Sequence, residues 1–434
     1  MKTIVAKFGG SSLADAAQFR KVRAIIESDP QRRFIVASAP GRRSANDVKV
    51  TDLLYECQAL AARHADPTPV LDQITARFTE IIEDLGIEFD LQTEMAIIRS
   101  RLRERDYMAS RGEYLNSKIL AAYLGVPFYD AAESVRFLRN GRPDYELTNE
   151  LLASALSNVD RAVVPGFYGA DASGVIRTFS RGGSDVTGSL VARAVGADLY
   201  ENWTDVSGML FADPRVVKDP RPVAFVTYRE LRELSYMGAS VLHEDAVFPV
   251  RKAGIPINIR NTNRPADAGT MIVPVDRAEQ SETAVTGVAG RPGFACITVE
   301  KGMMNGEIGF GAKLLTIFAK HGISFEHCPS GIDTMSVVVA SAPFEAERDA
   351  IFAEIEKELR PDHISVDDSI ALIAVVGHGM MGARGISAKV FHAMHKAGVN
   401  VRLIDQGPGE MNIILGVAES DLPIALQELY NELS

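Results

Sequence analysis

The sequence predicts an α/β protein in which a domain with a largely parallel sheet is followed by two small α+β units. Up to about residue 272, short apolar runs alternate with amphipathic stretches, which is typical of strands and helices in such a sheet. Residues 261–283 are poor in apolar periodicity and rich in Pro, Asp and Arg, which indicates a linker. Beyond it the chain repeats itself, because residues 312–325 align without gaps with residues 388–401.

Each element of the first domain follows from its local pattern. The apolar run 3–8 predicts a first strand, a glycine turn follows it, and residues 14–27 predict a helix. The run 34–38 predicts a second strand that again ends in small polar residues. Residues 161–167 and 198–203 predict further strands, each followed by a glycine or polar loop.

The two copies of the repeat each show the order strand, helix, strand, strand, helix. The first copy ends with an expected strand at 363–366, whereas the second has no residues left for one after its last helix. We expect residues 284–288 to supply that strand, which would make the first copy an insertion within the second. The expected division is a catalytic domain at 1–275, a linker with the contributed strand and the first unit at 276–369, and the second unit at 370–434.

Composition excludes several classes of protein. The 434 residues are 46% apolar and 24% charged, as in a soluble globular protein of several domains. A net charge of -11 without a long basic cluster argues against a nucleic-acid partner. No apolar run approaches the length of a membrane span, so we expect a cytoplasmic protein with no membrane partner. Cys57, Cys296 and Cys328 lack ligand spacing, and we expect no metal site built from the protein.

A lysine and a glycine turn stand at the end of the first expected strand. Glycines such as Gly9 and Gly10 let the backbone approach a phosphate, while N–H groups there, with Ser11 beside them, favour anions. Lys7 adds a compact positive charge. By itself this string is a common connection between a strand and a helix, and it is not a Walker A loop.

A second glycine turn, Arg181 to Asp185, opens a later helix. An arginine fork such as that of Arg181 matches a carboxylate, and Asp185 can hold a cation or a lysine. The alternative is a capped helix in which Asp185 only complements the helix dipole. A third string follows a strand, where Thr204 and Asp205 are suited to hydrogen bonds with a nucleotide and Arg215 could reach its phosphates.

Together, the strings KFGGSS, RGGSD and WTDVSG with the later DPR resemble the aspartate kinases of the amino-acid-kinase family. Arg111-Gly112-Glu113 also fits, the duplicated units resemble paired ACT domains, and the likeness covers the whole chain. The resemblance implies an amino-acid-kinase-type sandwich followed by two ferredoxin-like ACT domains. It also implies ATP-dependent phosphorylation of the β-carboxylate of L-aspartate with Mg²⁺, the first step towards lysine, threonine and methionine.

The resemblance assigns roles to individual residues. Lys7 would stabilise charge on the transferring phosphoryl group, and Asp185 would orient Lys7. The aspartate-binding residues would be Ser38, Thr51, Glu113, Arg181, Gly182, Gly183 and Ser184. The ATP-binding residues would be Lys7, Gly9, Gly10, Ser11, Thr204, Asp205, Leu210, Arg215, Ser240 and Val241. Here Ser240 replaces a lysine, and Leu210 a tyrosine, that other members often have.

In such relatives an effector amino acid binds between paired ACT units, usually across a dimer interface. The matching positions are Met303, Glu307, Phe310, Gly311, Phe325, Glu326, Ser330, Ile332 and Asp333. Acidic side chains there favour lysine as the effector, with threonine as the alternative. The resemblance also implies a homodimer or a higher homo-oligomer formed through the ACT domains.

Two other classes of function have some support in the sequence. Gly377 to Gly382 matches the dinucleotide fingerprint GxGxxG after an apolar strand, which would indicate a dehydrogenase. The chain ends too soon after it to complete a Rossmann domain, and the segment belongs to the repeat. A non-catalytic amino-acid sensor is the third class, and the intact Lys7, Arg181 and Asp185 argue against it.

Overall fold

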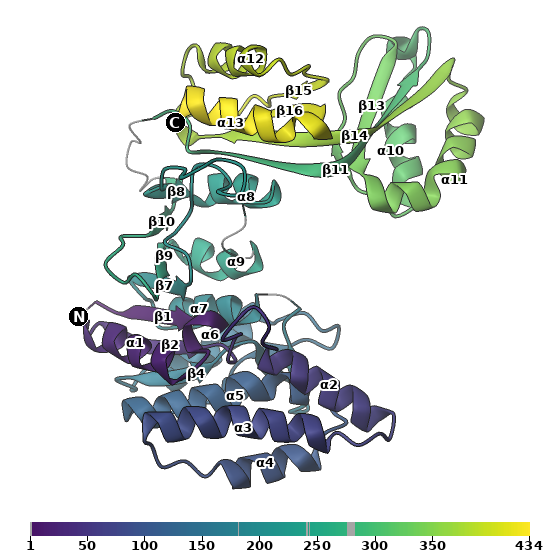
Figure 1. Cartoon of the computed structure of the whole chain (residues 1–434). Coiled ribbons are helices and arrows are strands. Elements are labelled where there is room, and N and C mark those ends of the chain that lie inside the picture. The colour runs from purple at the N-terminus through teal and green to yellow at the C-terminus, as the bar shows by residue number, and fades with distance from the viewer. Residues whose placement is uncertain (1, 181, 240–241, 243, 276–282) are drawn as a thin grey trace. The chain divides into compact units, whose positions relative to one another are not determined.

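The computed structural model describes residues 2–180, 182–239, 242, 244–275 and 283–434. In it the chain forms two compact units (Figure 1). The first unit comprises Met1–Met209, Pro222–Leu231 and Val241–Glu279, and the second comprises Leu210–Arg221, Arg232–Ser240 and Gln280–Ser434. Two short segments of the expected catalytic domain, 210–221 and 232–240, therefore count with the second unit.

A seven-stranded sheet organises the first unit. Its order is β4 (Ala162–Pro165), β2 (Arg32–Ala37), β1 (Ile4–Phe8), β7 (Leu199–Thr204), β9 (Ile257–Asn261), β10 (Thr270–Val273) and β8 (Phe225–Thr227). The first five run parallel, and β10 is antiparallel to β9. A small sheet contains β3 (Arg136–Phe137), β5 (Tyr168–Asp171) and β6 (Ile176–Thr178). The expected α/β fold with a largely parallel sheet is confirmed.

Helices occur between residues 16 and 253, and the expected helix at 14–27 is confirmed as α1. They are α1 (Ala16–Glu27), α2 (Val50–Ala62), α3 (Thr68–Leu85), α4 (Leu91–Ser100), α5 (Arg105–Leu124), α6 (Tyr145–Leu156), α7 (Gly183–Ala194), α8 (Tyr228–Tyr236) and α9 (Glu244–Ala253). Short 3₁₀ turns are η1 (Gly10–Leu13) and η2 (Ala131–Glu133). Among the described residues, no helix is both long and apolar enough to cross a bilayer.

The linker expected at 261–283 is wrong in part, because it contains β10. Only four residues form this strand, and two of its apolar side chains, Ile272 and Val273, are buried. Pairing with β9 and β8 satisfies its backbone. A run this short gives no periodic signal, which is why the sequence suggested a linker.

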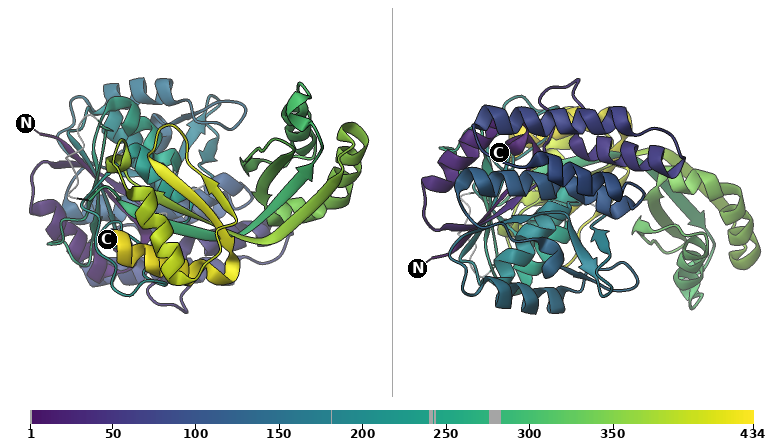
Figure 2. Two further views of the ribbon diagram at one scale, coloured as in Figure 1. Left: turned by 90° about the horizontal axis from the view of Figure 1, so that it is seen from above. Right: turned by 90° about the horizontal axis from the view of Figure 1, so that it is seen from below.

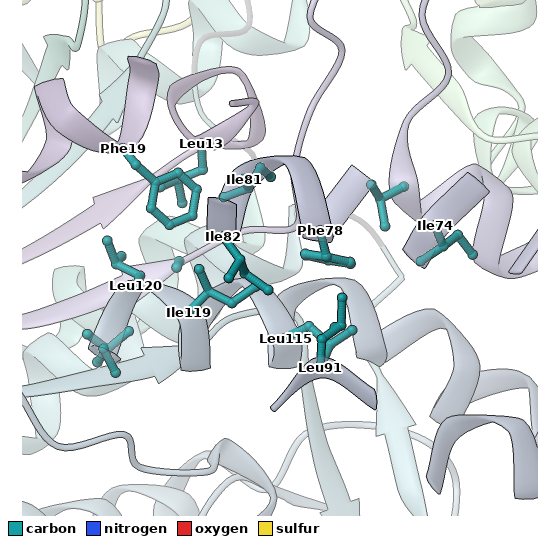
Figure 3. Packing of buried hydrophobic residues seen from close by; sticks show 14 of the residues in the cluster. Leu13, Phe19, Ile74, Phe78, Ile81, Ile82, Leu91, Leu115, Ile119 and Leu120 are labelled. Atoms are coloured by element: carbon teal, nitrogen blue, oxygen red, sulfur yellow. The ribbon is translucent and has the colours of Figure 1, made fainter. Parts of the chain in front are cut away.

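The two faces of the large sheet carry different side chains. Phe8 of β1 and Trp203 of β7 lie in a hydrophobic core with side chains of α1, α3, α4 and α5. Figure 3 shows side chains from these helices packed among one another. Successive side chains of a strand point to opposite faces, so Lys7 and Asn202 point away from this core. On that other face the sheet packs against α7.

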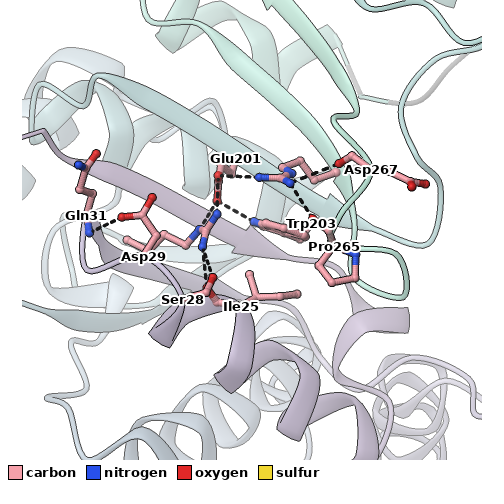
Figure 4. Close-up of polar contacts among 10 residues, drawn as sticks. Ile25, Ser28, Asp29, Gln31, Glu201, Trp203, Pro265 and Asp267 are labelled. Carbon is pink, nitrogen blue, oxygen red and sulfur yellow. Dashed lines mark hydrogen bonds and ion pairs between the residues drawn. The ribbon is translucent and has the colours of Figure 1, made fainter.

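A buried charged cluster lies near the start of β2. Arg32 donates to Glu201 through Nε at 2.7 Å, and the indole N–H of Trp203 donates to the same carboxylate at 2.8 Å (Figure 4). Arg260 contacts Glu201 at 3.6 Å and lies over the Trp203 ring. Two cations and an indole donor therefore compensate one buried carboxylate, as a charge removed from water requires.

The second unit is an antiparallel sheet with helices. Its strand order is β12 (Phe325–His327), β13 (Thr334–Ala340), β11 (Gly287–Glu300), β14 (His363–Val376), β16 (Asn412–Ala418) and β15 (Leu403–Asp405). The helices are α10 (Phe310–Lys320), α11 (Ser341–Leu359), α12 (Ile386–Ala397) and α13 (Leu422–Leu433). Its short turns are η4 (Met304–Gly306), η5 (His378–Met380) and η6 (Glu419–Asp421).

The long strands β11 and β14 serve both copies of the repeat, as Figures 1 and 2 show. Residues 294–300 of β11 pair with β13 of the first copy. Residues 287–291 pair with residues 372–376 of β14, which in turn pairs with β16 of the second copy. The strand expected at 284–288 thus begins at Gly287 and lies beside the second copy.

The dinucleotide-like glycines have a packing role. A Cβ on Gly377 would lie 2.1 Å from the carbonyl oxygen of Ala284, so no side chain fits there. A Cβ on Gly379 would lie 3.0 Å from Cα of the same residue. The glycines let the chain after β14 approach the backbone before β11, in a segment that belongs to the second copy.

Candidate active site

A buried lysine lies one residue before the end of the first strand. Lys7 is 6% exposed, and its ammonium group forms an ion pair with Asp185. The side-chain oxygen of Asn202 accepts a second hydrogen bond from the ammonium at 3.3 Å. The register of the parallel strands places Lys7 directly beside Asn202. The structure therefore brings together Lys7 and Asp185, the two residues for which the sequence predicted catalytic roles.

Asp185 lies in the first turn of α7, after the Gly182–Gly183 turn. Gly182 has φ 56°, in the left-handed region that favours glycine, and it caps the helix. The phenol of Tyr200 donates to the carbonyl oxygen of Asp185 at 3.1 Å, which ties this turn to β7. The helix start and the buried lysine together create a positive environment suited to an anion.

The glycine turn after β1 lies beside the turns that follow the neighbouring strands. The N–H of Gly9 donates to the carbonyl oxygen of Trp203 at 2.9 Å, and the N–H of Ser38 donates to the carbonyl oxygen of Phe8 at 3.1 Å. Gly10 and Ser11 begin η1. Gly9, Gly10, Ser11 and Ser38 therefore share one edge of the sheet with Lys7, as expected at the carboxyl ends of parallel strands.

Glu113 on α5 is buried beside the Ala39 turn. A Cβ on Gly112 would lie 2.8 Å from Ala39 Cβ, and this close approach of helix and turn brings in the next residue. Among the described residues the Oε2 atom of Glu113 has no hydrogen-bond partner. Burial raises the pKa of its carboxyl to about 8, while hydrogen bonds from N–H groups, including that of Ala39, act in the opposite direction. Such a carboxyl is suited to receive a cationic group.

Two further predicted substrate residues lie in this unit. Ser184 is buried in the first turn of α7, and a Cβ on Gly166 would lie 2.5 Å from its hydroxyl, so the end of β4 closely approaches this helix. Thr51 is half-buried in the first turn of α2. The side-chain amide of Asn116 on α5 donates to the carbonyl oxygen of Ser38 at 2.7 Å and fixes that turn.

The predicted nucleotide residues fall in two places. Thr204 ends β7, and its hydroxyl donates to Asp205 at 3.1 Å. Leu210 and Arg215 lie in the segment that counts with the second unit. Arg215 is exposed, and its guanidinium donates to Asp213 through Nη2 at 2.6 Å. Three other predicted site residues, Arg181, Ser240 and Val241, lie outside the described residues.

Most predicted effector residues occupy two adjoining loops of the second unit. The N–H of Met303 donates to Asp333 at 2.8 Å, and Asn305 donates to the carbonyl oxygen of Ile332 at 3.1 Å. Met303 and Ile332 are 83% and 70% exposed, a large apolar exposure for one pair of loops. The other predicted residues of this group are Glu307, Phe310, Gly311 and Ser330, which lie on these loops or at the start of α10.

Glu326 and Phe325 lie on β12. The carboxylate of Glu326 accepts a hydrogen bond from the phenol of Tyr236 and lies 4.0 Å from Arg291. Arg291 also lies over the Tyr236 ring, 5.2 Å from its centroid. Burial, followed by the hydrogen bond to Glu326, raises the pKa of Tyr236 to about 12. Glu326 therefore already has two partners within its own unit.

Two residues beside the site, Asn202 and Phe167, are not predicted by the sequence patterns. Asn202 contacts both Lys7 and Asp185, and its signal was an amide inside an otherwise buried strand. Phe167 has φ 77°, an uncommon backbone conformation for a residue with a side chain. It adjoins α7, because its N–H donates to the hydroxyl of Thr187 at 3.1 Å. No sequence pattern predicts such a conformation.

A cavity of about 680 Å³ opens beside this region, in the first unit. It is lined by thirteen residues, which include Tyr55 of α2, Arg105 of α5, Ser180 before α7 and Val186 of α7. Val186 follows Asp185 directly, so the cavity begins next to the first turn of α7. The described residues include no group of three or more acidic, histidine or cysteine side chains that could hold a metal ion.

Comparisons with known proteins place the chain in a family. A model of the amino acid kinase family matches residues 2–261, and a model of the ACT domain matches residues 373–433. Aspartokinase 3 of Bacillus subtilis (strain 168) is 37% identical over 446 residues, which cover 99% of this chain and 98% of the relative. The crystal structure of Clostridium acetobutylicum aspartate kinase has a TM-score of 0.95 and 47% identity, covering 99% of this chain and 100% of that one. E. coli aspartokinase III in complex with lysine and aspartate (T-state) has a TM-score of 0.73 and 25% identity, covering 100% of both chains.

The chain therefore belongs to the amino acid kinase family. Its class within that family is aspartokinase, a kinase, and its C-terminal part carries ACT domains. The dinucleotide-like glycines lie inside the matched ACT region, so the dehydrogenase interpretation is wrong.

Proposed function

We propose that this aspartokinase transfers the γ-phosphoryl group of ATP to the β-carboxylate of L-aspartate and forms 4-phospho-L-aspartate. The observation that carries this proposal is the ion pair of Lys7 and Asp185 beside the glycine turn after β1. The aspartate and lysine bound to the E. coli relative are consistent with the substrate and the type of effector.

The reaction needs little acid–base chemistry from the protein. The β-carboxylate has an ordinary pKa of about 3.9, so it is already ionised as a nucleophile near neutral pH. The difficulty is to align two anions that repel each other, which requires positive charge and fixed donors. Lys7 supplies positive charge that stabilises the negative charge on the transferring phosphoryl group. Asp185 holds the lysine in place and does not act as a base.

Glu113 is the residue that we assign to the amino group of aspartate. Its unpartnered Oε2 atom and its raised pKa mark a buried carboxyl that gains a partner when an ammonium group binds. Ser38, Thr51, Gly182, Gly183 and Ser184 would complete the substrate site from the strand ends and helix starts around it. Arg181 is assigned to the α-carboxylate through the family motif.

ATP would be held by the glycine turn, by Thr204 and Asp205, and by Leu210, Arg215, Ser240 and Val241. Mg²⁺ commonly binds through substrate phosphates with one or two carboxylates rather than in a cage of protein ligands. We therefore propose that Mg²⁺ reaches the site with ATP and neutralises phosphate charge there.

Regulation would come from the ACT domains, with lysine as the favoured effector and threonine as the alternative. The exposed Met303 and Ile332 belong to the expected effector region, and their apolar surface suits an interface between two copies of this chain. We propose a homodimer or a higher homo-oligomer formed there. We also propose the domain division 1–275, 276–369 and 370–434.

A turnover assay tests the function. ADP release is measured with ATP, Mg²⁺ and aspartate, and the assay is then titrated with lysine, threonine and both. We expect release that depends on aspartate, is absent when glutamate replaces it, and is inhibited by lysine at lower concentrations than by threonine. Equal release without an acceptor, or with glutamate, would refute the substrate assignment.

A further inference from the structure

We infer that Asn202 is a positioning residue of the phosphoryl-transfer site, which fixes the direction of the Lys7 ammonium group and holds Asp185 against it. The inference rests on the proposed roles of Lys7 and Asp185. It adds a third member to that pair, from the middle of β7.

The side-chain amide of Asn202 forms one hydrogen bond with Lys7 and one with Asp185. The carbonyl oxygen accepts from Lys7 Nζ at 3.3 Å, and the amide nitrogen donates to Asp185 Oδ1 at 3.0 Å. The residue is 3% exposed, so water does not replace these bonds. A side-chain amide carries one acceptor and two donors, and it can therefore bridge a cation and an anion at once. An apolar residue can do neither, and a carboxylate would repel Asp185.

The bridge formed by Asn202 determines the direction of the one N–H of Lys7 that remains for a ligand. An ammonium group has three donors, and Lys7 has two acceptors among the described residues, Asp185 and Asn202. One donor is left. The ammonium nitrogen lies 3.7 Å from the position of a Cβ on Gly9, next to the turn proposed to receive phosphates. Asn202 thereby directs the remaining donor towards the transferring phosphoryl group.

The strand register makes this geometry rigid. Lys7 and Asn202 are paired neighbours on β1 and β7, and the phenol of Tyr200, two residues earlier, donates to the Asp185 carbonyl oxygen. Donors that are oriented before the reaction need no rearrangement as charge develops, which is how such groups lower a barrier. Without the amide, Lys7 would keep only its ion pair with Asp185, and its other donors would lose their fixed direction.

The test compares Asn202→Leu and Asn202→Asp with a matched control. Asn258→Leu on β9 also removes a buried strand amide, but Asn258 contacts neither Lys7 nor Asp185, and its side-chain oxygen has no partner among the described residues. We expect Asn202→Leu to lower kcat at least tenfold with KM for aspartate changed less than threefold. We expect Asn258→Leu to keep kcat within twofold.

The pH profile of Asn202→Asp separates positioning from folding. A protonated carboxyl at this position would offer a donor to Asp185 and an acceptor to Lys7, as the amide does. Its activity relative to the parent protein should therefore rise as pH falls from 9 to 6, a change that a folding defect would not produce. Thermal unfolding of each variant is measured alongside.

Three results decide the inference. The inference is wrong if Asn202→Leu keeps full kcat. It is also wrong if the relative activity of Asn202→Asp does not change with pH, or if Asn258→Leu loses as much kcat as Asn202→Leu. A parallel Lys7→Met variant distinguishes a failure of the role of Asn202 from a failure of the proposed function of the site. If Lys7→Met is inactive while Asn202→Leu is fully active, only the role of Asn202 fails. If Lys7→Met keeps full turnover, the proposed function of the site fails.

Discussion

Lys7 and Asp185 form a buried ion pair, although one lies near the end of the first strand and the other in the first turn of a helix in the second half of the same unit. If Asp185 organises the site and is not a base, Asp185→Asn should lower kcat by about 100-fold, the scale of losing one oriented electrostatic contact. The residual activity should keep the pH profile of the parent protein. Steady-state kinetics from pH 6 to 9 are measured for both proteins. If Asp185 were a base, the fall in rate at low pH in the parent protein would be lost in Asp185→Asn, and this result would contradict its role as an organiser.

The raised pKa of Glu113 predicts a pH-dependent affinity for aspartate. Below about pH 8 the carboxyl of the free enzyme is mostly protonated, and an ammonium group binds its ionised form, so kcat/KM for aspartate should rise with pH and level off above about 8. Glu113→Gln should raise KM for aspartate about tenfold and remove this rise. The exposed Glu83→Gln on α3 is the control and should change neither quantity. A pH dependence that persists in Glu113→Gln would refute the assignment.

The cluster around Glu201 predicts a large stability effect. Glu201→Ala would leave Arg32 buried without its counter-charge, at a cost of about 3–5 kcal/mol. Thermal unfolding should show a much lower midpoint, and Arg32→Met combined with Glu201→Leu should recover more than half of the loss. The exposed pair of Arg23 and Glu27 offers the control, because Glu27→Ala should cost less than about 1 kcal/mol. Equal effects at the two sites would contradict the importance of burial.

Regulation can be tested at Glu326. Glu326→Ala should raise the lysine concentration for half-inhibition at least tenfold, with uninhibited kcat within twofold. Because Glu326 also accepts from Tyr236, Tyr236→Phe provides the comparison, since it removes only the phenol oxygen. We expect Tyr236→Phe to keep the inhibition curve of the parent protein. An unaltered curve in Glu326→Ala, or equal shifts in both variants, would rule out Glu326 as a direct effector ligand.

The sequence predicted those parts of the fold that local patterns determine. The apolar runs at β1, β2, β4 and β7 and the helix α1 follow from periodicity, and the glycine turns follow from their composition. In contrast, β10 was hidden because four residues are too short for a pattern.

The site was predicted in part for a similar reason. Lys7 and Asp185 belong to motifs with recognisable chemistry, and the structure joins them. Asn202 lies in a strand whose pattern says only that it is buried, and its role depends on the register between β1 and β7. The contact of Tyr236 with Glu326 likewise joins residues that are distant in the sequence, through tertiary packing that local patterns do not encode.

The central claim is that Lys7 carries the chemistry, and Lys7→Met tests it most directly. Single-turnover transfer from labelled ATP to aspartate is measured with Lys21→Met as the control, since Lys21 is an exposed residue of α1 that donates to Asn263. We predict that Lys7→Met folds and transfers the phosphoryl group at least about 1,000-fold more slowly. We predict that Lys21→Met transfers it at the rate of the parent protein. Transfer by Lys7→Met within tenfold of the parent rate would contradict the account.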